Sequence, residues 1–329
     1  MRAANHKFGL KLDQQTIVLV ISLIIFVLFS VSLSNFFSVG NLVAMIRSIS
    51  VLAILGLGMA IVVIGRGIDL SMVALMAVPT ALVMTLVESG NGLGYSIAVG
   101  LLFAVAVGAL NGVLVAYAEI PALFVTLAMG LALAGLGQIG ILKADMVSWP
   151  AGLDPIRWLG GSRLLGIPSS VLVAMAMFFA VGWFLTKTKL GRFVYSIGDN
   201  PHAARTTGIP VRPIMVLQYM LAALIAVLAG FVMASSNSLM DTRIYNLSLI
   251  YDVILVVVLG GIGLSGGRGG VWNVLVGTLL VGIVFNGMTI MNFPLDIQDL
   301  FKGIILLIAI AVDSFLNPRN EETAQQGDI

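Results

Sequence analysis

Ten apolar runs of 16 to 23 residues follow one another along this chain, and they limit what it can fold into. A helix needs about 20 apolar residues to cross the roughly 30 Å hydrocarbon core of a bilayer. Of the 329 residues, 59% are hydrophobic and 10% are charged, whereas soluble domains carry about 25% charged residues. We therefore predict an all-α, polytopic integral membrane protein with about ten transmembrane helices. The predicted spans are Thr16–Ser34, Leu42–Ile64, Leu70–Val87, Tyr95–Ala116, Ala122–Leu142, Ser169–Leu185, Ile214–Ser235, Leu249–Leu264, Val271–Met291 and Leu300–Leu316.

The distribution of positive charge predicts the orientation. With the N-terminus inside, 11 of the 17 lysines and arginines fall in inner segments, four fall in outer segments, and Arg47 and Lys302 fall near the outer ends of spans. Cytoplasmic loops carry an excess of Lys and Arg, so both termini are predicted to be cytoplasmic.

The spans divide the chain into a short cytoplasmic segment (1–15), one transmembrane domain (16–317) and a cytoplasmic tail (318–329). The tail is polar and is predicted to be disordered. Two loops are long: an outer loop, 143–168, whose tryptophans indicate a short interfacial helix, and an inner loop, 186–213.

Several classes of protein are excluded or disfavoured by residues that the sequence lacks. The chain has no cysteine, so it can form neither disulfides nor thiolate metal sites, and neither of its two histidines lies in a predicted span. No P-loop motif occurs, so the chain cannot bind ATP in one by itself. The acidic residues fall at or near span ends, which disfavours a proton relay at mid-depth. The sequence is therefore compatible with a channel, a sodium-coupled carrier or a transporter driven by a partner.

One serine matches a catalytic pattern. The run "GLSGG" (263–267) fits the nucleophile motif G-x-S-x-G, which would make Ser265 a candidate for an intramembrane serine hydrolase. Such a serine needs a base within hydrogen-bond reach, and no predicted span contains a histidine. A tight glycine turn is the favoured interpretation, with Ser265 able to cap the helix that follows.

Two apolar runs are interrupted by glycines in similar sequences, "VVIGRGIDLS" (62–71) and "VVLGGIGLS" (257–265), which we call the first and second glycine breaks. Only the first carries an arginine and an aspartate. Asp69 can cap the third span, because a carboxylate interacts well with the free N–H groups at a helix N-terminus. The alternative places Asp69 and Ser71 beside a translocation path, as a hinge or gate.

Polar residues within the spans are candidates for contact with a polar, uncharged solute. Most such side chains only join helices, for about 0.6 kcal/mol each. Asn111 and Asn286 are preferred because each is followed by a glycine that opens space beside the amide. The full set of in-span candidates is Asn111, Thr126, Gln138, Gln218, Asn286 and Asn292.

The inner loop contains a short, firmly bounded helix in "GDNPHAARTTGIP" (198–210). Asp199 or Asn200 is a plausible N-cap, Pro201 suits the first turn, and Gly208 with Pro210 ends the helix. This segment could be a solvated connector, or it could dock a cytoplasmic partner.

The longer run around this segment, "LGRFVYSIGDNPHAARTTGIPV", resembles the coupling loop of the membrane subunits of bacterial ATP-binding-cassette importers, in the ribose-type carbohydrate permease family. The runs "GIDLS", "GALNGVLVAYAEIPALFVTLAMG", "VVVLGGIGLSGGRGG" and "FKGIILLIAIAVD" agree with that family in order and spacing. The chain departs from the family where "YDVILVVVLGG" replaces a frequent acidic residue followed by "DAIAAVVLGG", although Asp252 is kept, and where Asp199 replaces a frequent glycine.

The resemblance implies a permease subunit of the bacterial inner membrane that forms the path for a sugar-like neutral solute with a second permease subunit. It also implies a cytoplasmic ATPase, which binds ATP and Mg²⁺ in place of this chain, and a periplasmic substrate-binding protein. The alternative is a self-contained channel or ion-coupled carrier. The coupling segment carried over from the family consists of Gly198, Asn200, Pro201, Ala203, Ala204, Arg205 and Gly208, and the path or gate candidates are Asp69, Ser71, Asn111, Thr126 and Asn286.

Overall fold

The structure is a computed structural model that describes residues 14–141, 145–243 and 248–316. The predicted tail, 318–329, and nearly all of the predicted N-terminal segment, 1–15, lie outside the described residues.

Each of the ten predicted spans falls on a helix. Seven of the described helices are long and apolar enough to cross a bilayer. Two apolar helices are shorter, with 17 residues in α3 and 11 in α11, and α13 carries two aspartates and a lysine in its first half. The helices are α1 (Gln14–Ser32), α2 (Val39–Ile64), α3 (Met72–Glu88), α4 (Leu93–Ala116), α5 (Ala122–Leu136), α7 (Ser169–Lys187), α10 (Val211–Asn237), α11 (Leu249–Leu259), α12 (Val271–Ile290) and α13 (Leu295–Leu316).

The eighth predicted span is too long by five residues. Helix α11 ends at Leu259 rather than at Leu264, because the chain turns at Gly260 and enters the left-handed region at Gly261, with φ of 90°. The fifth span also differs, since α5 is followed by a π-helical turn at Gly137–Ile141. Apolar composition predicts where a span lies, but glycine conformation decides where its helix stops.

The outer loop contains more than the predicted interfacial helix. A short helix α6 (Trp158–Gly161) does begin at a tryptophan, after the 3₁₀-helix η2 (Ala151–Ile156). Strand β1 (Met146–Ser148) pairs antiparallel with β4 (Leu239–Asp241), with Val147 opposite Met240. Strands β2 (Arg163–Leu164) and β3 (Ile167–Pro168) form a second two-stranded sheet, which is a small hairpin. The pairing of β1 with β4 joins segments about ninety residues apart, which local patterns do not predict.

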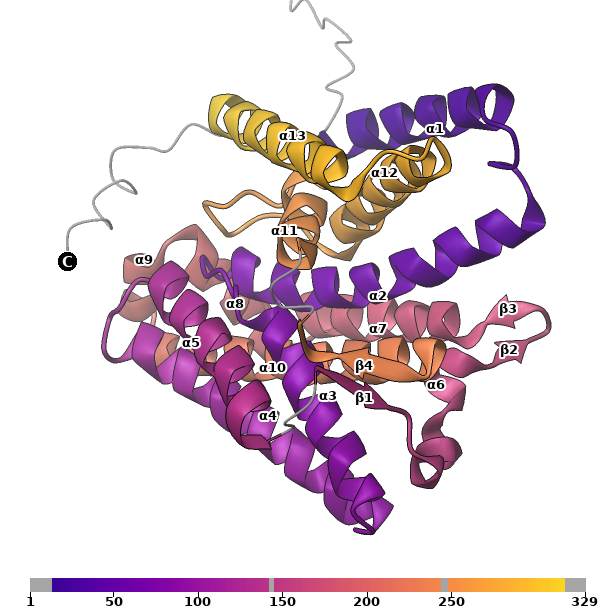
Figure 1. Cartoon of the computed structure of the whole chain (residues 1–329). Coiled ribbons are helices and arrows are strands. Elements are labelled where there is room, and N and C mark those ends of the chain that lie inside the picture. The colour runs from indigo at the N-terminus through magenta and orange to yellow at the C-terminus, as the bar shows by residue number, and fades with distance from the viewer. Residues whose placement is uncertain (1–13, 142–144, 244–247, 317–329) are drawn as a thin grey trace, which may run out of the picture.

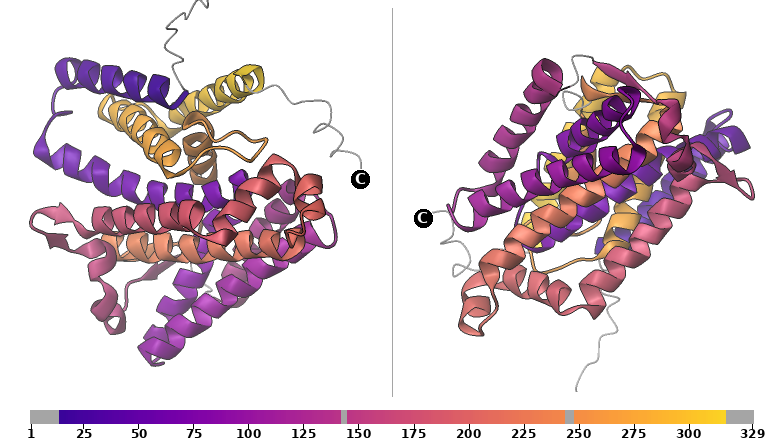
Figure 2. Two further views of the ribbon diagram at one scale, coloured as in Figure 1. Left: turned by 180° about the vertical axis from the view of Figure 1, so that it is seen from behind. Right: turned by 90° about the horizontal axis from the view of Figure 1, so that it is seen from below.

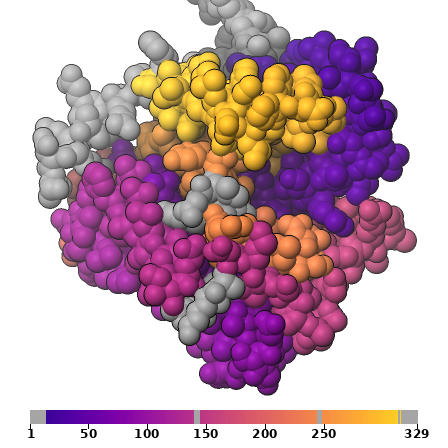
Figure 3. All heavy atoms as spheres, in the orientation of Figure 1, coloured from indigo at the N-terminus to yellow at the C-terminus, as the bar shows by residue number. Residues whose placement is uncertain are grey.

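Helices α2 and α10 form the centre of the molecule (Figures 1 and 2). In the most apolar 18-residue window of each, 61% of the residues are buried, compared with 11% in α1. Helices α3, α4 and α5 pack on one side of this pair, and α1, α11, α12 and α13 lie on the other. Figure 3 shows α13 on the outer surface of this second group of helices, next to α1. The outer helices therefore surround α2 and α10 and expose apolar side chains to lipid.

Small residues allow a close contact between α4 and α10. In α4, Gly108 and Gly112 form a G-x-x-x-G motif against α10. A Cβ on Gly108 would lie 2.7 Å from the carbonyl oxygen of Tyr219, and one on Gly112 would lie 2.5 Å from the Cα of Val216. Motifs of this kind let two backbones approach within a membrane, so α4 and α10 are fixed to each other next to the first glycine break.

Candidate functional site

The first glycine break turns the chain sharply between α2 and α3. Arg66 adopts the left-handed conformation, with φ of 69°, and the Gly67 N–H donates to the Val62 carbonyl at 2.8 Å. The glycines leave room for α10: a Cβ on Gly65 would overlap the Gln218 amide, and one on Gly67 would lie 2.6 Å from the Tyr219 hydroxyl oxygen. The turn therefore depends on glycine at the two positions that face α10.

The second break, between α11 and α12, is a series of glycine turns. Gly261, Gly266, Gly267 and Gly269 all have positive φ, from 73° to 103°. The run "GLSGG" is thus a tight turn, as predicted. Ser265 does not cap the next helix, because α12 begins at Val271 with Gly270 at its N-cap. Instead, the Ser265 carbonyl accepts from the Arg66 Nε at 2.8 Å.

The two breaks meet the inner loop. The Gly267 N–H donates to the Ile64 carbonyl at 2.8 Å, which joins the end of α2 to the second break. Gly198 packs on both, since a Cβ there would overlap the Ile64 oxygen and the Gly267 nitrogen. We call this meeting of residues 64–67, 198–199 and 265–269 the break junction. Most of its contacts are between backbones, so the three segments are packed directly against one another.

A tyrosine side chain also binds the junction. Helix α8 (Lys189–Asp199) carries Tyr195, whose hydroxyl donates to the Gly269 carbonyl at 2.8 Å. Burial raises the pKa of the Tyr195 hydroxyl above its usual value, so the hydroxyl stays protonated and remains a donor. Helix α8 is therefore bound to the second break by a side chain as well as by Gly198.

The predicted docking helix is present as α9 (Pro201–Thr206). Asn200 is its N-cap, and the Asn200 side-chain oxygen accepts from the N–H groups of His202 and Ala203, each at 3.0 Å. Gly208 ends the turn with φ of 82°. Only Ala204 of this helix is buried, while Ala203 and Arg205 are exposed. Helix α9 is thus held by one small apolar side chain and presents its other residues to the surroundings.

Four of the five path or gate candidates lie together at the first break. Asp69, Ser71, Asn111 and Thr126 all have zero exposure, and they come from the break itself, α4 and the first turn of α5. We call these four residues, with Gln218 and Tyr219 of α10, the break cluster.

Hydrogen bonds connect Asp69, Ser71 and Asn111 of the cluster. The Asp69 Oδ1 accepts from the Ser71 N–H at 2.9 Å and from the Ser71 hydroxyl at 2.5 Å, and the Asn111 amide donates to the Ser71 Oγ at 2.9 Å. The Leu70 N–H donates to the Thr126 Oγ1 at 3.0 Å. Asp69 therefore satisfies donors just before α3, although Ser71 occupies the N-cap position itself.

Four buried atoms of the cluster have no hydrogen-bond partner among the residues that the structure describes. Two are acceptors, the Asp69 Oδ2 and the Asn111 Oδ1, and two are donor-bearing groups, the Gln218 Nε2 and the Tyr219 hydroxyl. A buried polar group without a partner costs about 1–3 kcal/mol. The hydrogen bonds within the cluster therefore leave four of its polar groups unpaired among the described residues.

Asn286 lies apart from the cluster. It exchanges two hydrogen bonds with Asn41, at 2.9 and 3.0 Å, and so joins α12 to the start of α2. Asn286 also lines a cavity at that end of α2. Of the other in-span candidates, Gln138 and Asn292 are exposed.

Sequence reasoning missed the two tyrosines, Tyr195 and Tyr219. Their signal was weak, since each is a single aromatic residue in a helix. The G-x-x-x-G motif at Gly108 was a usable signal for the packing that places Tyr219 near the break. Within the described ranges, no group of three or more histidines or acidic residues is placed to hold a metal ion.

Comparison with known proteins identifies the family of the chain. Residues 41–310 match the family model described as branched-chain amino acid transport system / permease component. The ribose import permease protein RbsC of Escherichia coli strain K12 is 33% identical over 305 residues, covering 92% of this chain and 94% of that protein. The L-arabinose permease AraH of Azospirillum brasilense is 33% identical over 310 residues, 94% of this chain and 89% of that protein. The galactofuranose permease YtfT of Escherichia coli K12 is 32% identical over 280 residues, 84% of this chain and 80% of that protein. No solved structure matches the chain at a significant level.

Proposed function

Because this chain belongs to the family of branched-chain amino acid transport system permease components, we propose that it is the membrane subunit of an ATP-binding-cassette importer for a sugar-like, neutral polar solute. The relatives named for ribose, arabinose and galactofuranose support the solute class. The observation that carries the mechanism is the break junction, where the inner-loop helices contact both chain breaks.

The proposal includes three partners. A second permease subunit, either another copy of this chain or a different one, completes the path. A cytoplasmic ATPase binds ATP and Mg²⁺, and a periplasmic binding protein delivers the solute. The chain itself then has no catalytic role, and its place is the bacterial inner membrane.

The contacts on α8 and α9 suggest how force from an ATPase would travel. A partner pressing on the exposed residues of α9 would move α8 with it, because Ala204 is buried beneath α9 and Asn200 connects the two helices. The Gly198 contact would pass that movement to Ile64 at the end of α2 and to Gly267 in the second break. Both breaks would then shift together, and the break cluster lies directly beyond the first one.

The decisive test is purification followed by reconstitution. The tagged chain, gently solubilised from its native membrane, should bring down a P-loop ATPase, and the complex should take up a sugar into proteoliposomes only when ATP is supplied. A chain that purifies alone and moves a neutral solute without ATP would contradict the proposal and favour a self-contained channel or carrier.

Substitutions in α9 test the coupling role. Arg205→Ala and Pro201→Ala should leave folding intact and reduce uptake per ATP hydrolysed, because they alter the exposed face and the first turn of the docking helix. Arg157→Ala, which removes an exposed arginine from the outer loop, is the matched control and should behave as the unaltered protein. Normal coupling in both α9 variants would exclude α9 as the docking element.

A further inference from the structure

A cavity of about 610 Å³ lies at the end of α2 opposite the break junction. Its walls are the first half of α2, the end of α10, the start of α11 and the second half of α12. Arg47, on its α2 wall, is 18 residues before Gly65, which corresponds to about 27 Å along a helix. If the junction faces the ATPase, this cavity opens toward the other side of the membrane.

Arg47 is the most unusual residue of the cavity wall. It lies within an apolar span, and its Nε is buried with no hydrogen-bond partner among the described residues. A charged side chain in a transmembrane helix is costly and usually marks a functional site. A guanidinium offers five N–H donors in a planar fork, so Arg47 presents unused donors beside a hollow large enough for a ligand.

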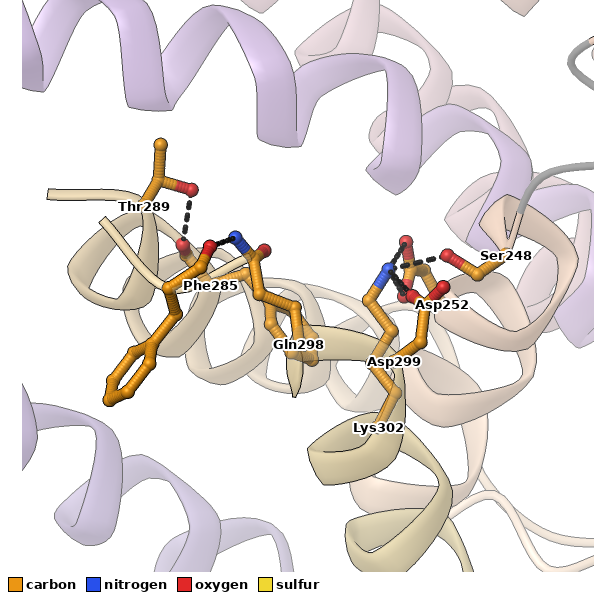
Figure 4. A network of polar contacts seen from close by, with 8 residues as sticks. Ser248, Asp252, Phe285, Thr289, Gln298, Asp299 and Lys302 are labelled. Atoms are coloured by element: carbon orange, nitrogen blue, oxygen red, sulfur yellow. Dashed lines mark hydrogen bonds and ion pairs between the residues drawn. The ribbon is translucent and has the colours of Figure 1, made fainter. Parts of the chain in front are cut away.

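A hydrogen-bond acceptor, the carboxylate of Asp252, lies on another wall of the cavity. Asp252 of α11 lines the cavity, and Lys302 of α13, which does not line it, contacts the Asp252 carboxylate (Figure 4). The Lys302 Nζ lies 3.1 and 3.2 Å from the two Asp252 oxygens, 2.7 Å from the Ser248 Oγ and 3.3 Å from an Asp299 oxygen. The side chains of Lys302 and Asp252 are only 12% and 16% exposed.

These contacts give Lys302 and Asp252 different roles. Lys302 has three donors, and it hydrogen-bonds Ser248 and the Asp252 Oδ2 while forming ion pairs with the Asp252 Oδ1 and with Asp299. Lys302 therefore orients Asp252, whose Oδ1 is buried, which leaves Oδ2 as the oxygen available to a ligand in the cavity. The Lys302 Nζ also lies 5.1 Å from the centre of the Phe285 ring, which is itself part of the cavity wall.

The charges around the cavity nearly cancel, which bears on the ligand. The positive charges of Arg47 and Lys302 balance the negative charges of Asp252 and Asp299 in and behind the cavity wall. Arg163 adds one exposed positive charge. Amides and hydroxyls complete the wall, including Asn237 and Ser48. A donor fork, a fixed carboxylate, neutral polar groups and an aromatic ring suit a molecule with many hydroxyls and no net charge. The volume lies in the range of about 300–1,000 Å³ that is typical of small-molecule sites.

We propose that this cavity is a solute-binding site on the outer side of the transport path, for a neutral polyhydroxylated solute of monosaccharide size, with Arg47 as the principal donor and Asp252 as the principal acceptor. This inference rests on the proposed importer function for its direction of transport. The break cluster, at the other end of α2, is then a separate point along the route.

The absence of cysteine from the chain allows a direct test. In the assembled complex in right-side-out vesicles, the Ser48→Cys variant places a single thiol in the cavity wall. A membrane-impermeant maleimide added outside should label it, and millimolar D-ribose, L-arabinose or D-fructose should slow the labelling several-fold. The Ser89→Cys variant, at an exposed turn after α3 and outside the cavity, should be labelled without protection by any sugar.

Arg47 is then changed in the Ser48→Cys background. Arg47→Gln should raise the sugar concentration needed for half-maximal protection about ten- to a hundredfold, the usual effect of losing a hydrogen bond to a charged group. Arg47→Lys should raise this concentration less. Arg243→Gln, which removes an exposed arginine that does not line the cavity, should have no effect. Wild-type protection in both Arg47 variants, no protection by any of the three sugars, or no labelling of Ser48→Cys from outside would each overturn the proposal.

The labelling requires no ATP, so it separates this inference from the importer function. Uptake that depends on ATP in a complex whose cavity gives no sugar protection would leave the function standing and remove the site. Sugar protection in a protein whose uptake is independent of ATP would do the reverse.

Discussion

At the scale of residues, the break cluster is the least expected arrangement in this chain. A carboxylate with zero exposure, Asp69, lies among apolar helices with one oxygen occupied by Ser71 and the other without a partner among the described residues. Its neighbours Asn111 and Ser71 extend the polar group into α4. The observed hydrogen bonds involve only the Asp69 Oδ1, and an asparagine could keep them through its own side-chain oxygen.

Substitutions at Asp69 therefore separate a local structural role from a role of its charge. Asp69→Asn retains an acceptor for the Ser71 donors, so we expect normal folding and most of the transport activity. Asp69→Ala leaves those donors unpaired and should lower stability by about 1–3 kcal/mol. Thermal unfolding in detergent, together with uptake in proteoliposomes, provides the measurement. Transport lost in Asp69→Asn at normal stability would show instead that the charge acts in the path.

At the scale of elements, the consecutive helices α8 and α9 form one structural unit of the inner loop. Helix α8 buries Gly191, Val194, Ile197 and Gly198, which occupy positions i, i+3, i+6 and i+7, and α9 buries only Ala204. This spacing is that of an amphipathic helix with one buried face. Near the end of α8, at Gly198, the inner loop reaches the backbone of α2.

Gly198 should accordingly tolerate no side chain. In Gly198→Ala, the added methyl would overlap the Ile64 oxygen and the Gly267 nitrogen, so α8 must move away from both breaks. We expect stability to fall by about 1–3 kcal/mol, with weaker coupling of ATP hydrolysis to uptake. Gly303→Ala is the matched control, because a Cβ on this α13 glycine would meet nothing within 4 Å. Equal melting temperatures for the two variants would argue against tight packing at the junction.

At the scale of the whole molecule, α2 connects the two regions to which we assign function. Its first half lines the cavity, and its last residue, Ile64, accepts from the second break. Helix α10 lies beside it with Gln218 and Tyr219 at one end and Asn237 at the other. A movement of the break junction would thus act on the cavity through two rigid helices rather than through loops.

The predicted orientation can be measured on the whole molecule. Asn91→Cys, in the turn between α3 and α4, should react with an impermeant maleimide only from outside, and His202→Cys, on exposed α9, only from the cytoplasm. The excess of positive charge in the inner segments is the physical reason. Labelling of both variants from the same side, or with the sides exchanged, would refute the orientation and the position of the cavity relative to an ATPase.

The sequence alone determined the class of protein, the positions of the ten apolar helices and the presence of a short helix in the inner loop, whose docking role stays a prediction. Runs of about 20 apolar residues in lipid can satisfy their backbone groups only as helices or closed barrels, and the Asn200–Pro201 and Gly208 signals bound α9 through local capping alone. The grouping of Asp69, Ser71, Asn111 and Thr126 required the tertiary structure, as did the separation of Asn286 from them. Helices in lipid are apolar on all sides, so their composition does not indicate which faces meet. The junction of Ile64, Gly198 and Gly267 was decided in the same way, because backbone contacts between glycines leave no side-chain pattern in the sequence.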